Sequence, residues 1–138
     1  PFLFQQMALF SLLGPSFGTP EMMRRILFSR DLPDSRLREY FSYVQAESQR
    51  VSLDMMGLNP LRLKPESLRM PILALGARND VFVSPALVEE TTRWYKAEVH
   101  IFPDMAHAMM LEMSWRNVAD YMLDWLDRAV NVQPAAAA

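Results

Sequence analysis

The stretch Met70-Pro71-Ile72-Leu73-Ala74-Leu75-Gly76-Ala77-Arg78-Asn79-Asp80 decides the predicted fold of this chain. Residues 70–76 form a short, continuous apolar run that ends at a glycine, which is typical of a strand buried on both faces of a parallel sheet. The polar residues that follow place the carboxylate of Asp80 just past the carboxyl end of this strand. Ligands and catalytic groups gather at that edge of open α/β sheets. The stretch therefore predicts both a buried strand and a carboxylate at a functional edge.

A helix and a second strand are predicted downstream. Ser84 suits an N-cap and Pro85 suits a first turn, and apolar residues recur behind them at helical spacing up to Tyr95. Residues 98–103 read as a second strand, and residues 115–126 read as an amphipathic helix. The order strand, helix, strand, helix predicts a βαβ unit with parallel strands. Because two strands do not complete a sheet, the first strand is expected to pair with a neighbour from outside the chain.

The residues before this unit read as helical. Thr19 can cap a short helix with Pro20 in its first turn. A longer helix is predicted to start near Pro33 and to continue as far as Val51, because apolar residues are spaced by threes, fours and sevens. No strand is expected before residue 70.

The domain organisation follows from this change of pattern. Prolines interrupt a polar stretch near residues 61–70, which predicts a boundary there. The last residues, Gln133-Pro134 and four alanines, carry no packing pattern and are expected to be a frayed tail. We therefore expect three parts: a helical region over residues 1–68, an α/β region over residues 69–130 and a tail over residues 131–138.

Composition excludes several classes of protein. The 138 residues are 51% hydrophobic and 22% charged with a formal net charge of −2, which is typical of one globular domain and excludes a disordered or coiled-coil chain. The basic residues are scattered, which argues against a nucleic-acid partner. The chain has no cysteine, so a disulfide scaffold and a thiol nucleophile are excluded. No apolar run reaches the roughly 18 residues of a membrane span, so a soluble, cytoplasmic protein is the default expectation.

An Asp–His pair is the candidate for chemistry. His107 follows the second strand as Asp80 follows the first, so neighbouring parallel strands would bring the two side chains together. A buried carboxylate that accepts from one imidazole nitrogen fixes the tautomer and stabilises the imidazolium formed at the other nitrogen. Asp80 would orient the ring, and His107 would transfer protons. Taken singly, each residue has a plainer interpretation, Asp80 as a turn residue and His107 as a structural histidine.

Taken together, these features resemble the last third of an α/β-hydrolase, over about residues 70–130. The resemblance rests on the stretch from Pro71 to Asp80, the capped helix from Ser84 to Tyr95, His107 and the helix of residues 115–126. In that family the triad runs Ser, Asp or Glu, His along the chain. The resemblance implies an α/β fold, with the C-terminal part of the hydrolase core preceded by a helical cap or lid. Relatives commonly have glycine before the histidine, where this chain has Met105-Ala106.

The resemblance also implies a nucleophile and an oxyanion hole. We expect both on an N-terminal segment of the same hydrolase outside this chain, since the opening at Pro1 suggests a cut upstream, and we expect the chain alone to be inactive. No metal and no other cofactor are expected, because the two histidines share no helical face. The following serines lie in segments that read as helix, cap or linker, so none is nominated as nucleophile: Ser11, Ser16, Ser29, Ser48, Ser52 and Ser67.

The expected activity is hydrolysis of a small apolar ester, or of a related acyl or carbon–carbon bond. Two alternatives stay open. One is a haloalkane dehalogenase or epoxide hydrolase with an aspartate nucleophile. The other is a non-catalytic ligand-binding relative or an interaction module, with a homo-oligomer formed through the exposed strand edge. Adaptable side chains suit an apolar substrate pocket, and the residues predicted to line it are Met109, Val81 and Met22.

Four further predictions concern neighbouring residues. Ordinary core packing is the plainer interpretation for most of the methionines. Asp104 is expected to form a turn rather than to replace Asp80 as the acid. His100, in the middle of the second strand, is expected to be packed or on the surface. Glu112 is expected to pair with the N-terminus of the last helix.

Overall fold

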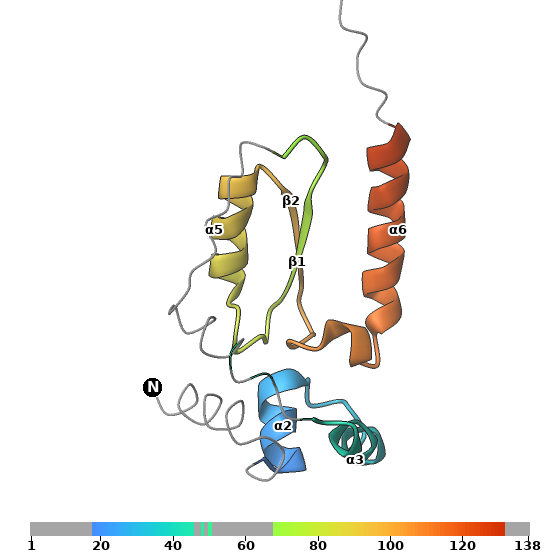
Figure 1. Ribbon diagram of the computed structural model, residues 1–138. Coiled ribbons are helices and arrows are strands. Elements are labelled where there is room, and N and C mark those ends of the chain that lie inside the picture. The colour runs from blue at the N-terminus through green and yellow to red at the C-terminus, as the bar shows by residue number, and fades with distance from the viewer. Residues whose placement is uncertain (1–17, 46–47, 49, 51–67, 132–138) are drawn as a thin grey trace, which may run out of the picture. The chain divides into compact units, whose positions relative to one another are not determined.

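The computed structural model describes residues 18–45, 48, 50 and 68–131, and these form a mixed α/β protein with one two-stranded parallel sheet (Figure 1). None of the helices among them is long and apolar enough to cross a bilayer. In chain order the elements are α2 (Pro20–Leu27), α3 (Asp34–Ser42), β1 (Leu73–Ala77), α5 (Pro85–Tyr95), β2 (Glu98–Phe102), the 3₁₀ helix η4 (Met109–Leu111) and α6 (Trp115–Asn131).

The chain packs as two units, and the division passes through α2. The helical unit contains the described residues as far as Arg25 and those from Leu32 to Arg50. The α/β unit contains residues 26–31 and 68–131.

In the helical unit, α2 begins where its capping residues predict. The backbone nitrogen of Met22 donates to Oγ1 of Thr19 at 3.2 Å, and Pro20 occupies the first helical position. Arg24 donates to the backbone oxygen of Leu32 and to a carboxylate oxygen of Asp34. Arg24 therefore ties α2 to the start of α3.

Helix α3 is shorter than its apolar spacing predicts. It begins at Asp34, directly after Pro33, but ends at Ser42, so the predicted continuation through Val44 is wrong, and Val51 lies outside the described residues. The backbone nitrogen of Val44 donates to the Phe41 oxygen, a bond between residues three apart, and the Ser42 hydroxyl donates to a backbone oxygen of the preceding turn at 2.6 Å. Such bonds tighten a last turn and compete with continuation of the helix.

The α/β unit contains the predicted pair of parallel strands. β1 and β2 pair in register from Leu73 opposite Glu98 to Ala77 opposite Phe102, which confirms the parallel pairing. β1 lies slightly later in the chain than its apolar run predicts, because pairing begins where the Glu98 nitrogen donates to the oxygen of Ile72. The two strands are joined through α5, as in a βαβ unit.

Local signals account for the position of α5. Oγ of Ser84 accepts from the backbone nitrogen of Leu87 at 3.3 Å, and Pro85 is the first helical residue. Lys96 takes a left-handed conformation, with φ of 51°, at the end of the helix. This conformation ends α5 and turns the chain into β2.

Helices flank both faces of the sheet (Figure 1). Gly76 of β1 and Ile101 of β2 are register partners and face α5, where Val88 lies against Gly76. On the other face, Ala77 and Phe102 pack with Val118 of α6 in a cluster that also includes Met105. Alternate residues of each strand thus face opposite helices, and the end of β1 is buried, with Ala77 fully so.

Polar and aromatic contacts fix α6 along β2. The ring of His100 stacks on that of Tyr121, with centroids 4.0 Å apart and planes 24° apart. The Tyr121 hydroxyl donates to Oε1 of Glu98 at 3.2 Å, and Arg128 donates to the same oxygen at 2.9 Å. His100 is therefore a packed side chain on the face of β2 that meets α6.

The close approach of α5 to β1 gives a stability prediction. A Cβ atom on Gly76 would lie 2.6 Å from Cδ1 of Ile101 and 3.0 Å from Cγ2 of Val88. Gly76→Ala should therefore lower the free energy of unfolding by about 1–3 kcal/mol through overpacking, measured by urea denaturation of the 138-residue chain. Ile101→Val removes the nearest atom, and alone it should cost about 0.5–1.5 kcal/mol.

The double variant is the control for this mechanism. If steric crowding at Cδ1 causes the loss, Gly76→Ala with Ile101→Val should lose less than the sum of the two single changes, because the residues are in contact. Strict additivity would contradict the crowding.

Candidate active site

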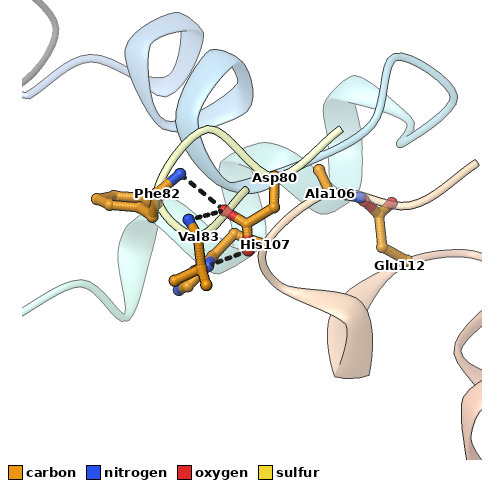
Figure 2. A network of polar contacts seen from close by, with 6 residues as sticks. All are labelled: Asp80, Phe82, Val83, Ala106, His107 and Glu112. Atoms are coloured by element: carbon orange, nitrogen blue, oxygen red, sulfur yellow. Dashed lines mark hydrogen bonds and ion pairs between the residues drawn. The ribbon is translucent and has the colours of Figure 1, made fainter. Parts of the chain in front are cut away.

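Two loops leave the same edge of the sheet, because β1 and β2 pair in parallel and end opposite each other at Ala77 and Phe102. Figure 2 shows the predicted pair that these loops carry. The bonding between β1 and β2 continues past the strand ends, where the Arg78 nitrogen donates to the Phe102 oxygen at 2.8 Å. The Asn79 nitrogen then donates to the Met105 oxygen at 3.0 Å. These bonds hold the loop that contains Asp80 against the loop that leads to His107.

The Asp80 carboxylate is buried and bonded at both oxygens. Oδ2 lies 2.9 Å from Nδ1 of His107, while Oδ1 accepts from the backbone nitrogens of Phe82 at 2.7 Å and Val83 at 3.0 Å. The side chain is only 8% exposed. Because three donors surround a carboxylate that can only accept when ionised, its orientation is fixed toward the imidazole. The structure thus brings Asp80 and His107 together, as their places after neighbouring strands predict.

The imidazole of His107 is more accessible than its partner. Its side chain is 41% exposed, and one face of the ring packs against Phe82, with centroids 4.7 Å apart and planes tilted by 48°. The bond to Asp80 places the proton of the neutral ring on Nδ1, which leaves Nε2 as the nitrogen that can accept a proton. The pair can therefore act as a general base that a carboxylate orients.

Glu112 does not behave as predicted. Its side chain accepts from Ser29 and Ala106 rather than from the first turn of α6: Oε1 takes the Ser29 nitrogen at 2.7 Å and the Ala106 nitrogen at 3.2 Å, and Oε2 takes the Ser29 hydroxyl at 2.7 Å. Glu112 is 2% exposed. The predicted pairing of Glu112 with the N-terminus of α6 is therefore wrong. The actual donors could not be predicted, because no local sequence pattern connects them to Glu112.

The other predicted site residues have different surroundings. Val81 directly follows Asp80 and is 46% exposed. Met109 packs against the buried cluster around Phe102. This agrees with the interpretation of the methionines as core residues. Met22 lies on α2, in the helical unit. Asp104 is an exposed residue of the turn after β2, and the carboxylate that bonds His107 is that of Asp80.

One pentapeptide has the spacing of a nucleophile elbow. Gly14-Pro15-Ser16-Phe17-Gly18 matches Gly-x-Ser-x-Gly, a spacing that the interpretation of this segment as helix, cap or linker misses. The predicted secondary structure does not mark Ser16 as an elbow serine, whereas the spacing of the flanking glycines does. Residues 14–17 lie outside the described part of the chain.

Comparison with known proteins does not assign a family. No family model, no curated protein and no solved structure matches the chain. Within the described ranges, no group of three or more His, Cys, Asp or Glu side chains could hold a metal ion. The chemistry of the site is therefore inferred from the geometry around Asp80 and His107.

That geometry predicts the effect of Asp80→Asn on the imidazole. The amide oxygen should stay at the Oδ1 position, where two backbone nitrogens donate, so the amide nitrogen should face His107. A donor at that place requires Nδ1 to accept, which moves the ring proton to Nε2. Nitrogen-15 NMR of histidine-labelled protein at alkaline pH should show Nδ1–H in the native chain and Nε2–H in the variant. His107→Asn assigns the signals, since the chain has two histidines, and an unchanged tautomer in Asp80→Asn would contradict the geometry.

Proposed function

We propose that this chain carries the acid and the base of an α/β-hydrolase that cleaves a small ester or a related acyl bond. The observation that carries the proposal is the bond of 2.9 Å between Nδ1 of His107 and Oδ2 of Asp80, formed beyond the carboxyl ends of two parallel strands. Catalytic groups collect at this edge in α/β proteins. The triad order of the family supports the same roles for the two residues.

In this reaction His107 moves the protons. Nε2 takes the proton of a serine hydroxyl as that oxygen attacks the carbonyl carbon, and it then gives this proton to the departing alcohol, which leaves an acyl-serine. Nε2 next takes a proton from the water that attacks the acyl carbon, and it returns this proton to the serine oxygen as the acid is released. Asp80 stabilises the imidazolium that forms between these steps. The two backbone nitrogens on Oδ1 hold the carboxylate in place, so that it need not reorient while the ring is charged.

The unequal burial of the pair favours catalysis over a purely structural role. A structural ion pair gains nothing from leaving its base accessible, whereas a base must meet a reactant. Here the carboxylate side chain is 8% exposed and the imidazole 41% exposed. The backbone bonds to Oδ1 would be enough to form the turn after β1. The turn therefore does not require the bond from Oδ2 to the imidazole.

The nucleophile comes from outside the described residues in this proposal. The expected source is an N-terminal segment of the same hydrolase, which would also add strands beside β1. Among the described residues β1 pairs with β2 alone, and a strand in the interior of a parallel sheet pairs on both edges.

Turnover of nitrophenyl esters of short acids tests the proposal, with this chain alone and with the longer protein that carries its N-terminal segment. The chain alone should have negligible activity. In the active protein, which carries the nucleophile, His107→Ala should lower kcat by about six orders of magnitude. His100→Ala is the matched control, because that imidazole stacks on Tyr121 instead of bonding Asp80. Its kcat should stay close to that of the native protein.

Turnover should be unchanged in Ser16→Ala, and its loss in a folded variant would contradict a nucleophile on the N-terminal segment. If haloalkanes or epoxides are turned over and esters are not, the nucleophile is an aspartate instead of a serine. Unchanged ester turnover in His107→Ala would overturn the proposed function.

A further inference from the structure

The buried carboxylate of Glu112 has no part in the reaction described above. Glu112 is 2% exposed and lies in the α/β unit, between η4 and α6. Its described partners are the Ser29 nitrogen, the Ser29 hydroxyl and the Ala106 nitrogen, and all three donate. A buried acceptor of this kind is costly unless donors satisfy it. These donors therefore have to stay in place for Glu112 to stay buried.

One of the donors is the backbone nitrogen of Ala106, the residue directly before the catalytic histidine of the proposed reaction. Figure 2 shows the Glu112 carboxylate against the nitrogen of Ala106, beside the bond between Asp80 and His107. The peptide directly after the histidine is held as well, because the Ala108 nitrogen donates to the Leu27 oxygen at 2.9 Å. The backbone of His107 thus lies between two anchored peptides.

Both anchors lead to the same segment of the α/β unit. Ala108 bonds Leu27 directly, and Ala106 reaches Ser29 through the two oxygens of Glu112. The segment formed by Leu27, Phe28 and Ser29 is therefore the support against which the histidine loop, residues 106–108, is fixed. Glu112 supplies the half of this support that precedes the histidine.

We infer that Glu112 is a positioning residue, which sets the histidine loop so that Nδ1 of His107 meets Asp80. The catalytic consequence rests on the proposed function, whereas the placement of the imidazole does not. Misplacement of a reacting group by about 1 Å can cost roughly a hundredfold in rate. A Glu112→Ala enzyme should therefore lose about 10- to 100-fold in kcat with little change in KM.

Two substitutions distinguish positioning of the histidine loop by hydrogen bonds from simple packing of the Glu112 side chain in the interior. Glu112→Gln keeps the length of the side chain: its oxygen can accept from both backbone nitrogens, and its NH₂ can donate to the Ser29 hydroxyl. Glu112→Ala leaves both backbone nitrogens without the carboxylate. The control is Glu98→Ala, which removes an exposed carboxylate that bonds Arg128 and Tyr121 away from the loop.

The experiment is nitrogen-15 NMR of the two imidazoles in the 138-residue chain, with circular dichroism to verify folding. Native protein, Glu112→Gln and Glu98→Ala should each show His107 as the Nδ1–H tautomer that bonds Asp80. Glu112→Ala should show a mixture of tautomers at His107, while the signals of His100 stay unchanged. Rescue by glutamine together with loss in alanine is the result that supports positioning.

Two results would overturn the inference: an unchanged tautomer of His107 in a folded Glu112→Ala variant, or the same loss in Glu98→Ala. If Glu112→Ala does not fold, Ser29→Ala takes its place, because it removes only the hydroxyl donor. That variant should partly shift the tautomer, and an unchanged His107 would again overturn the inference. The tautomer of His107 is measured without substrate, so this test does not depend on the proposed function. Failure of the proposed function would instead be seen as ester turnover that does not depend on His107.

Discussion

Parallel pairing of β1 with β2 is the constraint on which the rest of the α/β unit depends. Asp80 and His107 are separated along the chain by all of α5 and β2, and they meet because both strands end at one edge. Pairing also sets the register in which Gly76 faces Val88 and Phe102 faces α6. A slip of one residue in either strand would turn its side chains to the wrong faces. It would also separate the two loops.

The sequence predicted the parts of the structure that local chemistry determines. Both strands, the start of α5 at Pro85 behind the Ser84 cap and the start of α2 behind Thr19 follow from periodicity and capping residues within a few positions. The meeting of Asp80 with His107 could be predicted for a related reason, because the topology of a βαβ unit brings any two such loops together.

Other features depend on contacts that a single sequence does not reveal. Helix α3 ends at Ser42 although apolar spacing continues beyond it, because a hydroxyl bond and a tightened last turn compete with that spacing. The burial of Glu112 depends on Ser29, which lies far upstream in the chain and in a segment without a distinctive pattern. The elbow spacing around Ser16 is different, since it can be read directly from the glycines.

The two anchored peptides beside His107 also affect what a ligand would experience on arrival. Ordering the backbone of one residue costs roughly 1–2 kcal/mol in conformational entropy, and at the histidine loop this loss accompanies folding instead of binding. The half-exposed imidazole is therefore attached to a backbone that hydrogen bonds hold in place on both sides. An incoming molecule would find the proton-accepting atom already in position, and its affinity would not be reduced by the need to order this loop. Exposure at this site thus describes access from solvent and is compatible with a fixed backbone.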